Sequence, residues 1–368
     1  MTRVLHVTEA MGSGVLSLVD SISRRQTEAG AETVVLFVPR PETPGDDALR
    51  TRFHPGVRLT RVSTGSRRLD LLALYRAVRR EAREADVVHV HSSIAGAVAR
   101  AALRRRASPD RVFYSPHGFA FLRLDLPRLV RLGIRVIETV LARRSTLVLT
   151  SPSELAIAEA ALRPPRVRLL QTGVASDRIA VSPRRADPDR RPVVGMIGRV
   201  THQKAPWRFA AAAQELHGRA DFVWIGGGSP ADEARWLGSA PVRVTGWVSP
   251  DELVSLIDGI DVLLFPSLWE GMSLSLIQAQ AQGIPAVVSD VVGNRDSVDD
   301  GVSGFVRGTI AELIAATERL LDDPPLRERM SSAALEWARR ALTDDRIGTD
   351  SLALYAGATG LASTPRSW

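Results

Sequence analysis

Short apolar runs alternate with longer amphipathic stretches along the sequence, and this alternation limits the fold more than any other feature. The apolar runs are rich in Val, Ile and Leu, as is typical of strands that are buried on both faces. They cover residues 4–8, 33–39, 87–91, 112–115 and 147–150. The amphipathic stretches have helical periodicity and cover residues 14–29, 69–85 and 95–106. We therefore predict right-handed βαβ units and parallel sheets that helices cover on both faces.

The alternation stops once and then restarts, which predicts two α/β domains in a chain of 368 residues. The stop is the Pro- and charge-rich segment 182–192, which we interpret as a linker. The later strand-like runs cover residues 193–197, 220–225, 242–245, 262–266 and 286–289. The later helices are expected near 206–217, 250–258, 273–282, 309–322 and 325–342. The predicted divisions are 1–181, 192–343 and a C-terminal helix within 344–360, with the last ten or so residues disordered.

Composition excludes several classes of protein. The chain has no cysteine, which excludes disulfide scaffolds, cysteine-ligated metals and cysteine nucleophiles. It has no apolar run of about 18 residues, so no membrane-spanning helix is expected. Glu9 and Gly12 interrupt the first apolar stretch, which fits a strand better than a signal peptide. Aromatic residues make up only 5% and form no basic-aromatic platform, so nucleic acid is not an expected partner despite the net charge of +7.

The basic charge is concentrated in the first half of the chain. Residues 1–180 contain 29 arginines against 17 acidic residues, which predicts an anionic partner for this half. Within it, segment 119–144 combines six arginines with apolar residues that recur at helical spacing from Leu129 onward. One interpretation is a helix packed on its own sheet with its arginines in solvent. The other is contact with an anionic membrane surface and a lipid-linked acceptor.

Loops at strand ends contain the candidate binding residues, because ligands of open α/β sheets bind beyond the carboxyl ends of the strands. Gly12 and Gly14 follow the first strand and open a helix, where backbone N–H groups favour anions. A turn without a ligand would look the same. Gly198, Arg199 and Lys204 follow the first strand of the second half. The two cations could neutralise a diphosphate, or they could belong to a solvated loop.

Glu270 and three histidines are the other candidates. Glu270 precedes a helix that begins near Ser273. A carboxylate there could bond hydroxyl groups of a ligand, or it could simply be stabilised by the helix dipole. His117 follows a strand and could donate to phosphate or sugar oxygens, with charge near neutral pH. We assign His89 and His91 to opposite faces of their strand, which excludes a paired-histidine metal site. His91, at the strand end, remains the candidate on the acceptor side.

The motifs together resemble a retaining glycosyltransferase of family 4. They are the glycine loop at 12–14, the P-H-G tripeptide at 116–118, the G-R-x4-K segment from Gly198 and the E-G-x-x-L-x-L-I-x-A segment from Glu270. The resemblance covers nearly the whole chain. It implies the GT-B architecture, in which two Rossmann-like parallel-sheet domains face each other across a cleft and the C-terminal helix returns to the first domain. The segment 117–121 (HGFAF) also resembles enzymes of exopolysaccharide and lipid-linked glycan assembly.

The resemblance also implies a reaction and site roles. A hexosyl or N-acetylhexosaminyl group would pass from a nucleotide-diphosphate sugar, with UDP as the expected nucleotide, to a hydroxyl of a glycan, lipid-linked or small-molecule acceptor, with retention. Arg199 and Lys204 would bind the diphosphate, and Glu270 the sugar hydroxyls, with His117 beside both. The other implied donor contacts are Gly12, Gly14, Gly198, Val248, Met272, Ser273, Leu274 and Gln278. The expected location is cytoplasmic, and the alternative is peripheral association with the inner face of the membrane.

One residue departs from the family pattern. Gln278 stands where the family has a second glutamate that accepts both ribose hydroxyls. An amide has one acceptor oxygen, so we expect donor binding to be weaker by about 1–2 kcal/mol. A catalytically weak subunit that acts as a scaffold, and a nucleotide-sugar epimerase, therefore remain open alternatives. The spaced pair Asp187 and Asp189 lies in the predicted linker, so we expect no metal or other cofactor.

Overall fold

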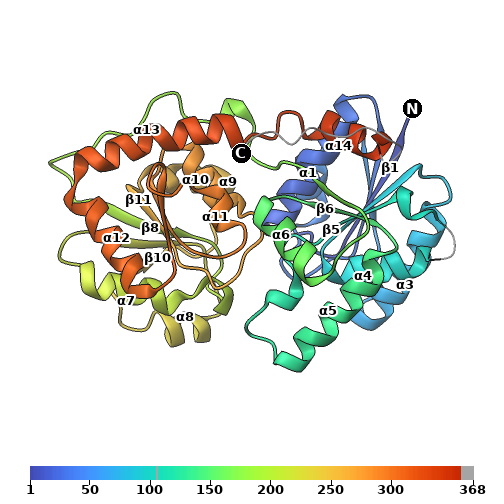
Figure 1. The fold of residues 1–368 in the computed structure, drawn as a ribbon, viewed down its shortest axis with the longest axis horizontal. Coiled ribbons are helices and arrows are strands. Elements are labelled where there is room, and N and C mark those ends of the chain that lie inside the picture. The colour runs from blue at the N-terminus through green and yellow to red at the C-terminus, as the bar shows by residue number, and fades with distance from the viewer. Residues whose placement is uncertain (105–106, 358–368) are drawn as a thin grey trace. The chain divides into compact units, whose positions relative to one another are not determined.

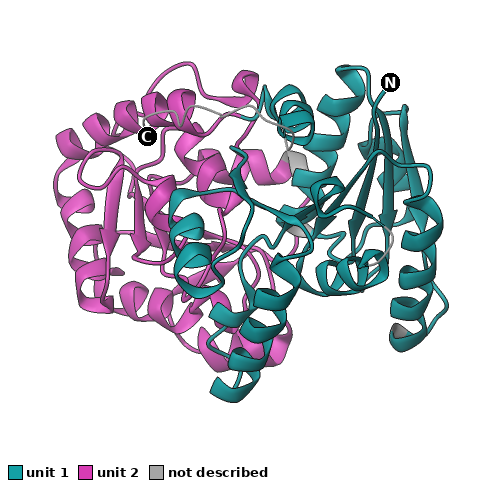
Figure 2. Cartoon of the chain, turned by 45° about the vertical axis from the view of Figure 1, so that its right-hand side comes forward, with its two compact units in different colours: residues 1–172, 344–368 teal, residues 173–343 magenta. Residues whose placement is uncertain are grey.

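The computed structural model describes residues 1–104 and 107–357, which form two compact units (Figure 1). The first unit contains residues 1–172 and the chain from Asp344 onward, and the second contains residues 173–343 (Figure 2). The expected disorder of the last ten or so residues, and the end of the helix expected over 95–106, fall outside the described residues.

A seven-stranded parallel sheet forms the centre of the first unit, in the order β3-β2-β1-β4-β5-β6-β7. Its strands are β1 (Arg3–Thr8), β2 (Glu32–Phe37), β3 (Val57–Arg61), β4 (Val87–His91), β5 (Val112–Ser115), β6 (Thr146–Leu149) and β7 (Val167–Leu169). Its helices are α1 (Ser13–Glu28), α2 (Asp46–Arg52), α3 (Arg67–Glu81), α4 (Ser93–Leu103), α5 (Arg128–Ala142), α6 (Pro152–Ala161) and α14 (Ile347–Ala356). Strand β1 therefore lies between β2 and β4, which brings its residues beside those of β4.

Alternate residues of β1 enter different parts of the core, as the pleat of a strand requires. Leu5 and Val7 pack in the cluster that α3 and α4 cover. Val4 packs on the other face, with Ile22 of α1 and Tyr355 of α14. The C-terminal helix α14 thus completes one face of the first sheet by packing against α1.

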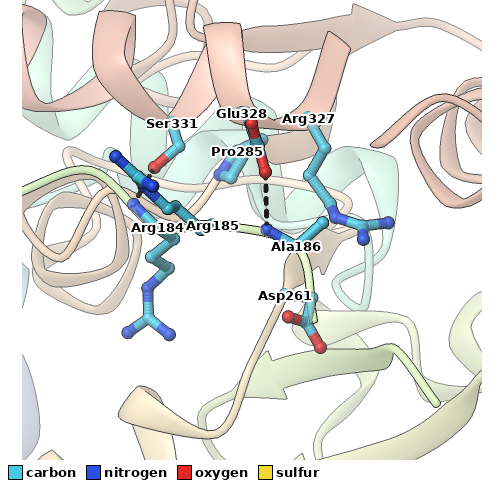
Figure 3. A pocket seen from close by; sticks show the side chains of 8 residues that line it. All are labelled: Arg184, Arg185, Ala186, Asp261, Pro285, Arg327, Glu328 and Ser331. Atoms are coloured by element: carbon cyan, nitrogen blue, oxygen red, sulfur yellow. Dashed lines mark hydrogen bonds between the residues drawn. The ribbon is translucent and has the colours of Figure 1, made fainter. Parts of the chain in front are cut away.

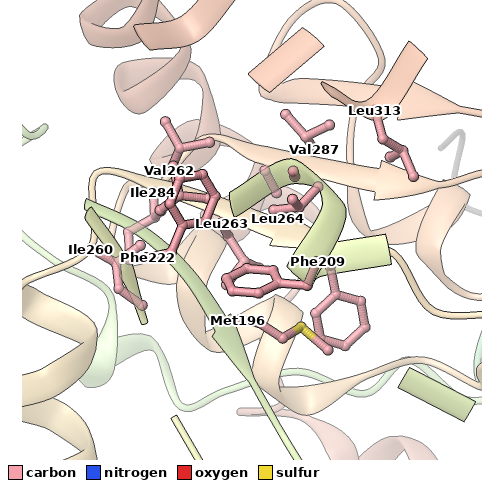
Figure 4. Packing of buried hydrophobic residues seen from close by; sticks show 14 of the residues in the cluster. Met196, Phe209, Phe222, Ile260, Val262, Leu263, Leu264, Ile284, Val287 and Leu313 are labelled. Carbon is pink, nitrogen blue, oxygen red and sulfur yellow. The ribbon is translucent and has the colours of Figure 1, made fainter. Parts of the chain in front are cut away.

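A six-stranded parallel sheet forms the centre of the second unit, in the order β10-β9-β8-β11-β12-β13. Its strands are β8 (Val193–Ile197), β9 (Asp221–Ile225), β10 (Val242–Val244), β11 (Val262–Phe265), β12 (Ala286–Ser289) and β13 (Gly304–Arg307). Its helices are α7 (Pro206–Leu216), α8 (Pro230–Trp236), α9 (Pro250–Asp258), α10 (Leu274–Ala281), α11 (Asn294–Ser297), α12 (Ile310–Asp322) and α13 (Pro324–Ala341). Phe209 of α7 packs edge-on against Phe222 in the core of this unit (Figure 4). It also packs edge-on against Trp224.

The sequence pattern predicted the central strands and missed three edge strands. Every predicted strand is present, and β4, β5, β8 and β12 have the predicted bounds. The missed strands β3, β7 and β13 each lie at the edge of a sheet. An edge strand has neighbours on one side only, so it needs no continuous apolar run and often carries charged residues. β3 (VRLTR) and β7 (VRL) show this composition.

Candidate functional site

Glycines line the carboxyl ends of β8, β9 and β10 in the second unit. A Cβ atom at Gly226 would lie only 2.3 Å from the carbonyl oxygen of Gly198, so the two loops touch through their backbones. The Trp224 indole donates to that same oxygen at 2.7 Å. Gly226 also forms a bridge with Gly246. The sequence analysis used only Gly198 here, although three successive glycines after a predicted strand, 226–228, were a signal for such a loop.

Lys204 and Glu270 form an ion pair in the second unit. Lys204 Nζ lies 2.7 Å from Glu270 Oε1, and the two side chains are only 13% and 7% exposed. Gln203 Nε2 donates to Glu270 Oε2 at 3.2 Å and to the carbonyl of Trp269 at 2.9 Å. The ammonium also lies 4.2 Å from the ring centroid of Phe265. The only lysine of the chain is thus held by a carboxylate that the sequence analysis had placed in the same site.

Gly198 and Arg199 belong to the same strand-end loop as Lys204. A Cβ atom at Gly198 would lie 3.1 Å from Lys204 Cε, so the glycine leaves room for the lysine stem. Arg199 is exposed, and it makes no ion pair within the described parts of the chain. A free guanidinium beside a paired ammonium can still accept an anionic ligand.

Helix α10 begins just after Glu270, and its first turn is uncapped by a side chain. Ser273 is the N-cap residue, and its hydroxyl makes no capping bond. The loop before the helix packs closely against Gly293, where a Cβ atom would lie 1.8 Å from the carbonyl oxygen of Gly271. Met272 and Leu274 pack against the apolar cluster of α10 and α13. The backbone amides of the first turn of α10 are therefore available to a ligand.

Gln278 and Val248 are both partly buried. In the described residues, the Gln278 side-chain amide has no hydrogen-bond partner, so it is available to a ligand. Val248 packs against the core of the second unit, which leaves its backbone as the available part. An aromatic group close to Lys204 in the sequence was not predicted: the His202 ring lies 5.0 Å from Trp207 and 5.9 Å from Trp269, centroid to centroid.

The loop after β1 in the first unit contains Gly12, which is the N-cap residue of α1. A Cβ atom there would lie 2.6 Å from Glu42 Cγ, whereas Gly14 has open space around it. Glu9 was not among the predicted site residues. It is buried and accepts from Arg40 Nη2 and from the amide of Ala95, each at 2.7 Å. This carboxylate caps the N-terminal turn of α4.

Three residues other than glycine have left-handed backbone in strand-end loops. Ser92 after β4 has φ 71°, His117 after β5 has φ 54°, and Ala205 beside Lys204 has φ 49°. Such conformations cost about 1–3 kcal/mol each in residues other than glycine, and they cluster at functional sites. Their positions fit strand-end binding loops in both units.

The prediction that His89 and His91 face opposite sides was wrong. Residues two apart on a strand share a face. Their rings lie 4.3 Å apart, and His6 of β1 joins them. These three residues could each offer one ligand atom to a metal ion, all within 4.8 Å of one another. Each of their six ring nitrogens is hydrogen bonded to another protein group.

Burial changes the expected roles of His91 and His117. His91 is 1% exposed and bonds His6 and His117 through its two nitrogens, a position that does not support direct contact with an acceptor. Burial lowers the pKa of His117 to about 4. The charge near neutral pH that we expected for His117 is therefore not favoured.

A separate pocket in the second unit contains none of the predicted site residues. It is lined by Arg184, Arg185, Ala186, Asp261, Pro285, Arg327, Glu328 and Ser331 (Figure 3). The amide of Ala186 donates to Glu328 Oε1 at 2.9 Å, and the amide of Arg184 donates to Ser331 Oγ at 2.8 Å. These contacts attach part of the predicted linker to α13.

Comparison with known proteins gives matches over both units. Residues 12–178 match the family described as Glycosyltransferase Family 4, and residues 191–323 match the family described as Glycosyl transferases group 1. A D-inositol 3-phosphate glycosyltransferase of Stackebrandtia nassauensis is 30% identical, over 77% of this chain and 71% of that protein. The UDP-Gal:alpha-D-GlcNAc-diphosphoundecaprenol alpha-1,3-galactosyltransferase of Escherichia coli is 28% identical, over 76% of this chain and 77% of that protein.

Solved structures share the architecture at low sequence identity. Anabaena HepE in complex with UDP-glucose superposes with a TM-score of 0.76 at 17% identity, over 97% of this chain and all of that one. This likeness concerns the fold, which is the two-domain GT-B fold predicted from the sequence. Among the described residues, no helix is both long and apolar enough to cross a membrane.

Proposed function

This chain belongs to glycosyltransferase family 4, and from that premise we propose that it transfers a sugar from a nucleotide-diphosphate donor to a hydroxyl of an acceptor. The observation that carries the proposal is the Lys204–Glu270 pair, whose loops also contain the exposed Arg199 and the uncapped start of α10. Cations and backbone amides suit a diphosphate, and a carboxylate suits sugar hydroxyls. The name of the E. coli relative includes UDP-Gal, and HepE has been solved in complex with UDP-glucose. Both support UDP as the nucleotide.

In the proposed reaction the bond between the anomeric carbon and the diphosphate oxygen breaks, and the acceptor oxygen bonds to that carbon. The acceptor oxygen attacks on the face from which the diphosphate leaves, which gives retention, and the acceptor proton passes to the leaving diphosphate. Arg199, Lys204 and the first amides of α10 offset the charge that develops on the leaving group. Because these groups supply that stabilisation, we propose that the reaction needs no metal and persists in EDTA.

The remaining site residues keep the roles that the family implies. Glu270 bonds hydroxyls of the donor sugar, and Gln278 bonds the ribose through its amide. Gly12, Gly14 and His117 supply the contribution of the first unit to donor binding. The transferred group is proposed to be a hexosyl or N-acetylhexosaminyl group.

A variant series tests this proposal. Lys204→Ala removes one of the stabilising cations, so kcat should fall by about 10²–10³. Arg329→Ala, which removes an exposed arginine of α13, is the matched control and should leave kcat unchanged. A panel of nucleotide sugars, tested first by thermal shift and then for release of the nucleoside diphosphate, identifies the donor. A folded chain that turns over no nucleotide sugar would instead support the scaffold alternative, and turnover without an acceptor to an isomeric nucleotide sugar would support the epimerase.

A lipid-linked acceptor at an anionic membrane surface is the proposed partner of the first unit. Helix α5 has exposed apolar side chains, which are Leu129, Val130, Leu132, Val136, Ile137 and Val140. Its inner side is fixed by an ion pair of 2.8 Å between Arg100 of α4 and Glu138 of α5, both nearly inaccessible. The helix thus packs on its own unit and still offers an apolar face flanked by arginines, a pattern typical of interfacial helices. A lipid-linked substrate in the name of the E. coli relative supports this assignment.

A further inference from the structure

A buried chain of hydrogen bonds connects the C-terminal helix α14 to His117 in the first unit. Gln26 of α1 lies at its centre and bonds Ser351 and Tyr355 of α14 on one side and His6 on the other. His6 bonds His91 at 2.9 Å, and His91 bonds His117 at 2.9 Å.

A second branch runs from Tyr355 to His89, at 2.7 Å, and from His89 to Ser115, at 2.9 Å. Both branches end on serine hydroxyls whose protons are already committed. Ser351 Oγ donates to the carbonyl of Gly348, and Ser115 Oγ donates to the carbonyl of Val148, each at 2.8 Å. A carbonyl oxygen can only accept, and a hydroxyl has a single proton. Each serine must therefore accept at its other contact.

The Ser351 end fixes the direction of the first branch. Since Ser351 Oγ accepts, the amide nitrogen of Gln26 faces α14 and its oxygen faces His6. His6 must then donate from Nε2, so its Nδ1 accepts from His91 Nε2. By the same step, His91 Nδ1 accepts from His117 Nε2.

The second branch gives the same direction from its own end. Ser115 accepts from His89 Nε2, so His89 Nδ1 accepts from the Tyr355 hydroxyl. That hydroxyl has then given its proton and must accept the second N–H of Gln26, which lies 3.2 Å away. Burial lowers the pKa of all four histidines, which keeps one proton on each ring.

We propose that α14, acting through Gln26, holds His117 in the tautomer that has its proton on Nε2 and an acceptor lone pair on Nδ1. Within the described chain, His117 Nδ1 has no hydrogen-bond partner, so this lone pair is free for a ligand. Gln26, Ser351 and Tyr355 are positioning residues. If the proposed function holds, His117 accepts from a donor-sugar hydroxyl and does not donate to phosphate.

Nitrogen NMR of the full chain with ¹⁵N-labelled histidine tests the tautomer without any nucleotide sugar. Two-bond correlations at neutral pH should show His6, His89, His91 and His117 as neutral rings with protonated Nε2. Single His→Gln variants identify each signal. A proton on Nδ1 of His117, or a charged ring, would overturn the assigned direction. Neither result depends on whether the chain is a transferase.

The role of α14 needs a variant that frees the Gln26 amide. Ser351→Ala with Tyr355→Phe removes both of its acceptors and keeps the packing volumes nearly unchanged. The His117 Nδ1 signal should then move toward the protonated range as the tautomers mix. Ser23→Ala with Tyr75→Phe is the control. Ser23, like Ser351, is a buried helical serine whose hydroxyl donates to the carbonyl three residues earlier. An unchanged His117 spectrum in the first double variant would refute the role of α14.

Discussion

Gly293 shows how one residue without a side chain supports the proposed donor site. Its φ is +81°, and a Cβ atom there would lie 1.8 Å from the carbonyl oxygen of Gly271, next to Glu270. Gly301 has a similar φ of +77° but open space around it. The two positions therefore separate backbone strain from displacement of the Glu270 loop.

We expect Gly301→Ala to lower the free energy of unfolding by about 1–2 kcal/mol, the cost of a left-handed residue with a Cβ atom. Gly293→Ala should cost more, and it should also lower kcat/KM because the Glu270 loop must move. Urea unfolding and steady-state kinetics of both variants measure this. Equal losses of activity in the two variants would contradict the role assigned to Gly293.

Gln278 is the position at which the donor site departs from its family. A carboxylate there accepts from both ribose hydroxyls and makes charge-assisted bonds. Gln278→Glu should therefore tighten UDP binding by about 1–2 kcal/mol, or roughly 5- to 30-fold in Kd. Calorimetry measures this, with Gln214→Glu on the exposed side of α7 as the control for added charge. No change at Gln278 would argue against contact with ribose.

The histidine cluster predicts a loss of stability in acid. Burial lowers the pKa of His6 and of His117 from 6.5 to about 4. Between these values the unfolded chain binds protons that the native chain excludes, so the free energy of unfolding falls as the pH is lowered. The slope is about 1.4 kcal/mol per pH unit for each histidine. Urea titrations from pH 7 to pH 4 should show a smaller slope in His117→Gln than in His217→Gln, and equal slopes would contradict it.

At the scale of elements, α5 differs from the other helices in the apolar side chains that it exposes. Val136→Glu with Ile137→Glu should lower the bound fraction in sedimentation with anionic vesicles, because burying a carboxylate in the lipid interface is unfavourable. Leu72→Glu, at an exposed apolar position of α3, is the control and should bind as the parent chain does. An anionic membrane surface would be contradicted if the parent chain, the α5 variant and Leu72→Glu bound equally. Equal binding of the parent chain to vesicles without anionic lipid would contradict it too.

The strand-end loops contain the candidate residues of both units, and their positions follow from the order of the elements. Arg199 and Lys204 follow β8, Glu270 follows β11, and these strands are neighbours in the sheet. The family resemblance placed these residues in one site, and the strand order brings their loops to neighbouring positions. The sequence analysis could not foresee that Lys204 and Glu270 pair directly, because spacing along the chain does not give the side-chain distance of 2.7 Å.

At the scale of the molecule, two α/β units each have their own sheet and apolar core. Family membership, the fold and the residues of the second unit agree on a glycosyltransferase. The first unit holds the histidine chain, and its completion depends on α14, which comes from the far end of the sequence. Residues of β1, α1 and α14, which are far apart in the sequence, therefore belong to the hydrogen-bond chain that ends at His117.

The amino-acid sequence by itself determined the alternation of strands and helices, the two α/β domains and the loops that contain Gly198, Arg199, Lys204 and Glu270. A local pattern reports whether a segment is buried and with what period. It does not report which segment becomes its neighbour. Only the tertiary structure placed β1, β4 and β5 side by side and so brought His6, His91 and His117 into contact. Three of the four edge strands, β3, β7 and β13, escaped prediction because a strand with one neighbour needs no continuous apolar run.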